Sequence, residues 1–174
     1  MNIKFHAMDD AHVSLLKSWF LKKHVKDVWL IEGYATVEQL LQAKQGNGYD
    51  YPFIIYWENV PIGYVQACDL YAYRTECPKP KGLFTAEAPG TFCMDLFIGE
   101  ENYLNRGYGT EIVKAFIHYI FANFNANKIL IDPATSNQRA IRCYEKAGFR
   151  FVREEFDGIT HCYIMQINNP NTYT

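Results

Sequence analysis

The chain has 174 residues, of which 49% are hydrophobic and 16% aromatic, and this composition predicts a single globular domain over residues 1–174. The formal net charge of −2 at pH 7 argues against nucleic-acid binding, which usually needs a basic face. No apolar run suits a membrane span or a signal peptide, and the five cysteines are widely spaced. We therefore expect a cytoplasmic protein with no membrane partner, no disulfide framework and no metal site.

The N-terminal third predicts one strand and two helices. Ile3 and Phe5 indicate a short strand, and Asp9 or Asp10 can cap the helix that follows. Residues 27–33 are expected to form a loop that carries an exposed aromatic side chain, Trp29. The pattern Thr36-Val-Glu-Gln39 is a capping box and predicts a second, short helix.

The next segment predicts a hairpin and a long loop. Residues 52–57 and 62–69 are apolar runs separated by a turn, which is typical of two paired strands. Residues 70–90 contain three prolines and two glycines, and we expect them to form an excursion that folds over a functional site.

Residues 92–120 predict a strand, a loop and a helix. The alternation of Met94 and Leu96 with Asp95 and Phe97 has strand period, which places the Asp95 carboxylate on the opposite face from Met94. A helical apolar stripe begins after Gly109. The intervening loop offers flexible backbone, a cation and the free N–H groups of a helix start, which together favour a phosphate. Its residues are Asn105, Arg106, Gly107, Tyr108, Gly109 and Thr110.

This loop is neither a P-loop nor a dinucleotide fingerprint, because the Lys-Ser/Thr pair of the first and the third small residue of the second are missing. Taken alone, its glycines could equally serve a tight helix entry. Residues 127–132 predict a strand parallel to the one at 92–97, joined to it by a right-handed crossover. A helix over 137–147 and a hairpin of 149–156 with 161–167 complete the chain.

Two motifs together carry a family resemblance. The strand–Arg106-Gly-Tyr-Gly109–helix unit, followed by Ser136-Asn137-x-x-Ala-x-x-x-Tyr144-x-x-x-Gly-Phe149, resembles the GCN5-related N-acetyltransferases (GNAT), which use acetyl-CoA. Within that superfamily the segment 132–149 is most similar to the aminoglycoside 6′-N-acetyltransferases. The resemblance covers residues 50–167, with one departure: Leu104 stands where the family usually has Gln or Arg. It implies an α/β fold whose mixed, mostly antiparallel sheet has a splayed parallel strand pair and helices on both faces.

The resemblance also implies a cofactor site. The family holds the pantetheine arm between two splayed strands, which here end near Ile98 and Asp132. Phe97 and Ile98 would supply backbone groups to the arm, and Asn137 would contact it through its side chain. Tyr144 matches the general acid that protonates the departing thiolate, although it could also be a packed aromatic residue.

Substrate residues follow by the same resemblance. Asp95 matches the carboxylate that binds the amine and accepts its proton, the alternative being an ordinary exposed strand aspartate. Asp132 matches an acidic residue that meets the sugar amines, or is a turn aspartate before proline. Tyr64 and Gln66 fall on the substrate wall, and Trp29 could stack on a sugar ring or pack at the core edge. We assign no nucleophilic role to Cys143 or His118.

We therefore expect an acetyl-CoA-dependent N-acetyltransferase that acts on a primary amine of a cationic small molecule, the 6′-amine of an aminoglycoside, as in antibiotic resistance. We expect a monomer or a homodimer. Two alternatives stay open. One is a GNAT enzyme acting on another amine, namely a polyamine, a siderophore hydroxylamine or a protein amino terminus, and the other is a non-catalytic CoA-binding domain.

Overall fold

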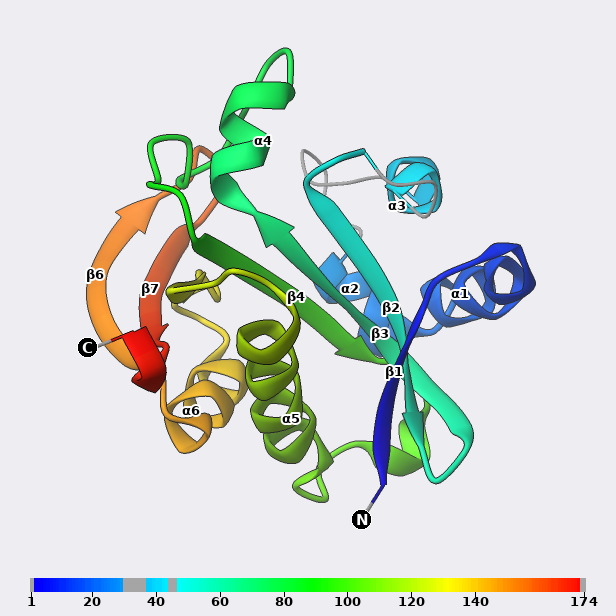
Figure 1. Ribbon diagram of the computed structural model, residues 1–174. Helices are drawn as coiled ribbons and strands as arrows, with labels where there is room; N and C mark the ends of the chain where they lie inside the picture. The colour runs from blue at the N-terminus through cyan, green and yellow to red at the C-terminus, as the bar shows by residue number, and fades with distance from the viewer. Residues whose placement is uncertain (1, 30–36, 44–46, 173–174) are drawn as a thin grey trace.

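Seven strands of the described chain form one sheet in the order β1-β2-β3-β4-β5-β7-β6 (Figure 1). The computed structural model describes residues 2–29, 37–43 and 47–172. β4 and β5 pair in parallel, and every other neighbouring pair is antiparallel. This confirms the expected mixed, mostly antiparallel sheet. The strands are β1 (Ile3–Ala7), β2 (Asp50–Trp57), β3 (Val60–Asp69), β4 (Thr91–Ile98), β5 (Lys128–Ile131), β6 (Arg150–Phe156) and β7 (His161–Asn168).

Helices cover both faces of the sheet, as the resemblance implied (Figure 1). α5 joins β4 to β5 and packs on one face together with α6; we call this the α5 face. The opposite face, the α1 face, is covered by α1, α2 and α3. No helix in the described part of the chain is both long and apolar enough to span a bilayer. The helices are α1 (Val13–Phe20), α2 (Lys23–Trp29), α3 (Val37–Ala43), α4 (Leu70–Glu76), α5 (Tyr108–Asn123) and α6 (Gln138–Ala147), with short 3₁₀ turns at Asp10–His12, Glu101–Tyr103 and Pro170–Thr172.

The helix ends follow local chemistry. Asp9 caps the first turn, since its Oδ1 accepts a hydrogen bond from the Ala11 N–H at 3.0 Å. The Oδ1 atom of Asn137 accepts one from the Ala140 N–H at 3.2 Å, and α6 therefore begins after Asn137. Gly148 ends α6 with φ of 107°, a left-handed conformation that favours glycine.

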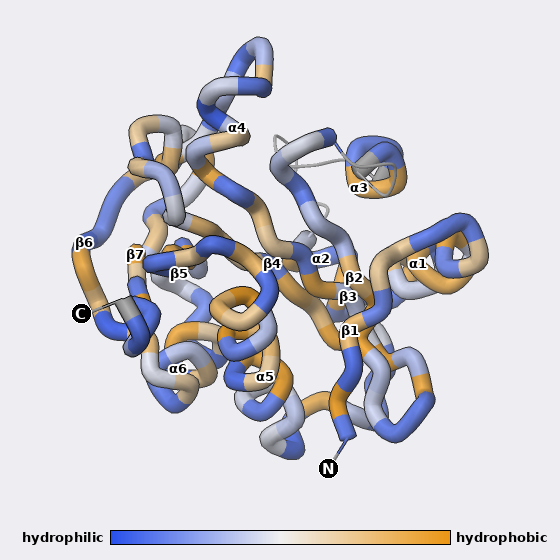
Figure 2. The backbone as a smooth tube through the Cα atoms, in the orientation of Figure 1, coloured by the Kyte–Doolittle hydropathy of each residue, from blue (hydrophilic) through white to orange (hydrophobic). Residues whose placement is uncertain are grey.

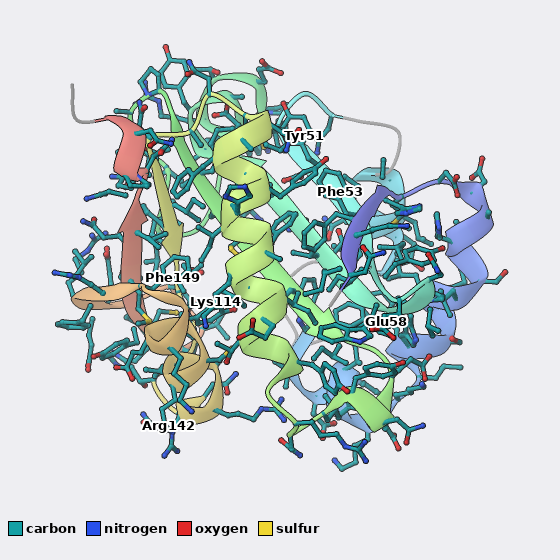
Figure 3. All side chains as sticks on the ribbon, turned by 60° about the horizontal axis from the view of Figure 1, so that its bottom comes forward. Tyr51, Phe53, Glu58, Lys114, Arg142 and Phe149 are labelled. Atoms are coloured by element: carbon teal, nitrogen blue, oxygen red, sulfur yellow. The ribbon has the colours of Figure 1, made fainter. Side chains whose placement is uncertain are left out.

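Period-two alternation divides the strand side chains between the two faces. On β2, Phe53 points to α5, where its ring lies 5.8 Å from that of Phe116, while Ile54 belongs to the α1 face. Figure 3 shows Tyr51 and Phe53 beside α5. In Figure 2, α5 is hydrophobic on one side and hydrophilic on another, as a helix lying on a sheet should be. The main core therefore lies between α5 and the sheet.

The α1 face carries two apolar clusters with a polar strip between them. Successive same-face residues on β3 and β4 pair in register, in the order Tyr64↔Phe97, Gln66↔Asp95 and Cys68↔Cys93. The polar strip is the middle pair, Gln66 and Asp95. The α1 cluster is Met8, Leu16, Trp19, Phe20, Val25, Leu40, Ile54, Tyr64 and Phe97, and the α4 cluster is Cys68, Leu70, Phe84, Leu130, Cys162 and Ile164.

β4 and β5 separate after a short paired stretch. Their parallel pairing runs from Thr91↔Lys128 to Cys93↔Leu130, whereas β4 continues to Ile98. The last five residues of β4 therefore have β3 on one side and, within the described residues, no strand partner on the side of β5. This is the splay that the resemblance implied.

Two local expectations were wrong. Residues 27–29 belong to α2 rather than to a loop, and residues 30–33 of that predicted loop lie outside the described chain, as does Thr36 of the predicted capping box. Residues 70–76 form α4, which Asp69 caps by accepting hydrogen bonds from the Tyr71 and Ala72 N–H groups, both at 3.0 Å. The segment 70–90 packs in the α4 cluster, and none of its residues lines the cavity described below.

Candidate active site

A cavity of about 1090 Å³ lies at the splay. Its wall contains Met94 and Leu96 from the α5 face and Gln66 and Asp95 from the α1 face. Since one strand contributes side chains from both of its faces, the cavity passes through the opening between β4 and β5. A ligand can therefore reach the same point from either side of the sheet.

Asp95 lies on the floor of this cavity, in the polar strip. The Gln66 Nε2 group donates a hydrogen bond of 3.4 Å to Asp95 Oδ2. Burial raises the pKa of the Asp95 carboxyl above its ordinary value, the Gln66 hydrogen bond lowers it, and the charge of Asp50 raises it further. A carboxylate with a raised pKa is a better proton acceptor than an exposed aspartate.

Asp132 and Asp157 add negative charge to the same cavity. Asp132 follows β5, and burial, reinforced by the charges of Asp95 and Asp157, raises the pKa of its carboxyl to about 7. Asp157 lies in the β6–β7 turn, where its Oδ1 accepts hydrogen bonds from the Ile159 and Thr160 N–H groups, both at 2.7 Å. These three carboxylates make one end of the cavity attractive to a polycation.

Tyr144 lines the cavity from α6. Its ring packs edge-on against Phe149, with ring centroids 5.7 Å apart. Burial raises the pKa of the Tyr144 phenol, and the charges of Asp95, Cys143 and Asp132 raise it further. The phenol therefore keeps its proton and can donate it in a hydrogen bond to a developing anion.

The loop before α5 has the geometry of an anion site. Gly107 caps α5 with φ of 84°, a conformation that side chains other than glycine rarely adopt. The Thr110 N–H donates a hydrogen bond to the Gly107 carbonyl at 3.1 Å, whereas the N–H groups that precede it at a helix start have no intrahelical partner. The Gly107, Gly109 and Thr110 positions line the cavity. Asn105 has φ of 58°, and its Oδ1 accepts a hydrogen bond of 3.4 Å from Arg139 Nη1. This loop is thus connected to the first turn of α6.

The structure brings most of the predicted site residues to one cavity. Three predicted residues do not line it. Tyr64 is fully buried and its hydroxyl donates a hydrogen bond to Gln66. Arg106 is exposed, and Tyr108 packs against Trp57 and Tyr103 at ring separations of 4.4 and 5.2 Å. The predicted residues that line the cavity are Trp29, Gln66, Asp95, Phe97, Ile98, Asn105, Gly107, Gly109, Thr110, Asp132, Asn137 and Tyr144.

Two further placements refine the predictions. Trp29 is half-buried rather than exposed, because its ring packs edge-on against Tyr64 at 5.7 Å and Phe97 at 5.0 Å. His118 is exposed on α5 and does not line the cavity, whereas Cys143 does line it. Burial raises the pKa of the Cys143 thiol, which leaves it protonated and unsuited to nucleophilic attack.

Sequence reasoning missed cavity residues at both ends. Asp157 lies between the two strands of the predicted hairpin of 149–156 with 161–167, and it reaches the cavity because the sheet order places β7 next to β5. Helix α6 contributes the cations Arg139, Arg142 and Lys146 to the wall. Their i, i+3 and i+7 spacing on the predicted helix was a usable signal, since such residues share one helix face. The cavity thus has an acidic part and a basic part.

Comparisons with known proteins give consistent matches. A model of the acetyltransferase (GNAT) domain matches residues 9–156. Aminoglycoside N(6')-acetyltransferase type 1 from Klebsiella pneumoniae is 29% identical over 154 residues, which cover 85% of this chain and 74% of that protein. Spermine/spermidine N(1)-acetyltransferase from Bacillus subtilis (strain 168) is 31% identical over 159 residues, covering 91% of this chain and 95% of that protein.

The same likeness extends to solved structures. The crystal structure of aminoglycoside acetyltransferase AAC(6')-Ib in complex with coenzyme A and kanamycin matches with a TM-score of 0.82 at 25% identity, covering 97% of this chain and 95% of that chain. The region matched by the domain model contains β4, β5, α5 and α6, the elements that enclose the cavity.

Proposed function

Because this chain belongs to the family of GNAT-domain acetyltransferases, we propose that it transfers an acetyl group from acetyl-CoA to a primary amine of a polycationic small molecule, the 6′-amine of an aminoglycoside. The observation that carries the proposal is the position of Asp95, Asp132 and Asp157. All three carboxylates line one cavity at the splay between β4 and β5. An aminoglycoside carries several ammonium groups, and their positive charge complements the negative charge of this part of the cavity wall.

The residues at the splay fit acetyl-CoA. β4 continues beyond its pairing with β5, so backbone groups of Phe97 and Ile98 can pair with an amide-bearing arm as an added strand would. The Ile98 carbonyl is also hydrogen bonded to His24 Nε2 at 3.0 Å. The first turn of α5 after Gly107 fits a pyrophosphate, and the cations of α6 lie along the same cavity. Acetyl-CoA would supply an activated thioester. Because the Oδ1 atom of Asn137 already caps α6, we expect its side-chain amide to make the predicted contact with the arm.

Asp95 and Tyr144 would divide the proton transfers. A substrate amine with an ordinary pKa near ~10 arrives as an ammonium ion. Asp95 holds this cation and accepts its proton, directly or through a water molecule, which frees the amine to attack. Tyr144, on the other side of the opening, donates a hydrogen bond to the sulfur as negative charge develops there. Asp132 and Asp157 hold the remaining ammonium groups.

A polyamine is the second candidate substrate. The spermine/spermidine N(1)-acetyltransferase of Bacillus subtilis aligns along nearly its whole length. A linear polyamine also carries several cations, so the acidic wall alone does not separate the two substrates. We further propose a cytoplasmic location, because acetyl-CoA is available there and the five cysteines are free thiols.

Free-thiol release from acetyl-CoA over a panel of aminoglycosides, polyamines and peptides tests the proposal. We expect turnover with aminoglycosides that have a 6′-amine, and none with those that have a 6′-hydroxyl. Asp95→Asn should lower kcat about 100-fold while the affinity for acetyl-CoA changes little, whereas Asp27→Asn, which removes an exposed carboxylate of α2, should leave kcat unchanged. Acetyl-CoA binding without turnover of any amine, or equal rates in Asp95→Asn and the parent, would contradict the proposal.

A further inference from the structure

A buried tyrosine, Tyr64, is hydrogen bonded to Gln66 of the polar strip. Tyr64 on β3 has 0% exposure, and its ring stacks on Phe97 at 5.6 Å and meets Trp29 edge-on at 5.7 Å. These ring contacts hold the position of the Tyr64 side chain. The Tyr64 hydroxyl lies 2.7 Å from Gln66 Oε1 and donates a hydrogen bond to it.

The hydrogen bonds of this strip run in one direction. An ionised carboxylate only accepts hydrogen bonds, so Gln66 must turn its NH₂ group toward Asp95, as the 3.4 Å contact from Nε2 to Oδ2 has it. The amide carbonyl then faces away, toward Tyr64. Burial raises the pKa of the Tyr64 phenol well above its ordinary value, which keeps the hydroxyl a donor. The Tyr64 hydroxyl therefore orients the Gln66 amide, and the Gln66 amide orients the Asp95 carboxylate.

We propose that Tyr64 is a positioning residue that acts through Gln66 to keep Asp95 ionised and aimed into the cavity. Without the tyrosine hydroxyl, the Gln66 carbonyl loses its donor, and the amide is free to turn over. A turned amide presents oxygen to Asp95, which favours the protonated carboxyl. We call the chain of hydrogen bonds from Tyr64 through Gln66 to Asp95 the relay. The role of Asp95 as a base rests on the proposed function, whereas the existence of the relay does not.

Among the charged groups near Asp95, Asp50 on β2 acts against its ionisation by raising the pKa of the Asp95 carboxyl. The charge of Asp95 in turn raises the pKa of Asp132 after β5, of Tyr144 on α6 and of Cys93 on β4. From α2, His24 lines the same cavity, and its Nε2 atom is hydrogen bonded to the Ile98 carbonyl at 3.0 Å. Among the causes that shift the Asp95 carboxyl, the Gln66 hydrogen bond is the one that favours the charged form.

The direct test is a ¹³C NMR titration of the aspartate carboxyl carbons in the full-length protein, with the Asp95 signal assigned by its loss in Asp95→Asn. Tyr64→Phe removes the hydroxyl and keeps the packed ring. We expect it to raise the Asp95 pKa by about half a unit to one unit, since a hydrogen bond to a charged group is partly lost. The acid limb of kcat/KM against pH should move upward by the same amount. Tyr56→Phe is the matched control, because it removes a β2 hydroxyl whose partner is His12, outside the cavity.

Gln66→Met supplies the second half of the test. It should raise the Asp95 pKa at least as much, and adding Tyr64→Phe to it should cause no further shift, because the effect passes through Gln66. An unchanged titration in Tyr64→Phe, or an equal shift in both backgrounds, would overturn the relay. If Asp95→Asn stays active, the proposed role of Asp95 fails, yet the NMR titration still decides whether the relay exists.

Discussion

Asp132 should make the protein less stable as pH rises, and Asp132→Asn should remove much of that dependence. The Asp132 carboxyl follows β5 in the cavity wall, where burial and the charges of Asp95 and Asp157 raise its pKa from 3.8 to about 7. In the unfolded chain the same carboxyl ionises near its ordinary value. Between these two values the folded state holds a proton that the unfolded state has lost.

The sign follows from proton counting. Because the folded pKa is the higher one, the favourable contribution of protonated Asp132 is complete below about pH 4 and is lost as pH rises toward 7. A shift of about 3 units corresponds to about 4 kcal/mol at 1.36 kcal/mol per unit. Asn stays neutral at every pH, but its amide needs a partner in a half-buried site, which costs about 1–3 kcal/mol. We therefore expect Asp132→Asn to be about 2 kcal/mol more stable than the parent at about pH 8, and no more stable than the parent at about pH 4.

Urea unfolding and thermal unfolding at a series of pH values measure this difference. For a domain of this size, about 2 kcal/mol corresponds to about 5 °C in Tm. Asp27→Asn is the control, because Asp27 is exposed on α2. Parallel stability curves for the parent and Asp132→Asn across this pH range would refute the reasoning, whatever their offset. Asp132→Asn should also bind cationic substrates more weakly, because it removes a negative charge from the cavity wall. The variant would therefore gain stability at the expense of substrate binding.

Three further substitutions test other parts of the molecule. Tyr144→Phe should lower kcat about 100-fold with little change in the KM for acetyl-CoA, and steady-state kinetics that show equal kcat values would remove the acid role. Gly107→Ala places a side chain at a φ of 84°, where the new Cβ would meet no atom of the described residues within 4 Å. The backbone strain should cost about 1–2 kcal/mol and raise the KM for acetyl-CoA, so an unchanged Tm and KM would contradict the required conformation. Phe116→Ala empties a fully buried position between α5 and the sheet, and should lower the free energy of unfolding by about 3–5 kcal/mol, as measured in urea; a loss below about 1 kcal/mol would show that the core refills.

The elements that form the centre of the sheet were predictable because their signals are local. The strand with Asp95 shows clear alternation, and Gly107 and Gly148 lie where the backbone needs positive φ. The helix α4 was missed because the prolines and glycines of residues 77–90 dominated the reading of the segment. Its signal was present in Asp69, whose side chain caps the first turn.

The site was harder to predict because coverage of a strand face is a tertiary property. Tyr64 and Gln66 were both expected on the substrate wall, and they share a strand face because they are two residues apart on β3. This spacing does not predict that Trp29 and Phe97 pack against Tyr64 and bury it, while Gln66 remains in the cavity wall. Asp157 shows the same limit, because its turn reaches the cavity through a strand order that the sequence does not contain.

The polar strip explains how one sheet face can be both core and active site. On β4, Phe97 belongs to the α1 cluster and Cys93 packs against the α4 cluster, so the face is apolar on either side of Asp95. Residues of α1, α2 and α3 pack in the first cluster, and Leu70 of α4 and Phe84 pack in the second. The low polarity of the flanks raises the pKa of Asp95 by burial, and the missing strand partner beyond Cys93 keeps the same carboxyl within reach of a ligand. Asp95 thus lies both in the polar strip between the two apolar clusters and at the splay between β4 and β5. Because it has both positions, this strand aspartate is partly desolvated and still accessible to a ligand, which makes it a candidate base.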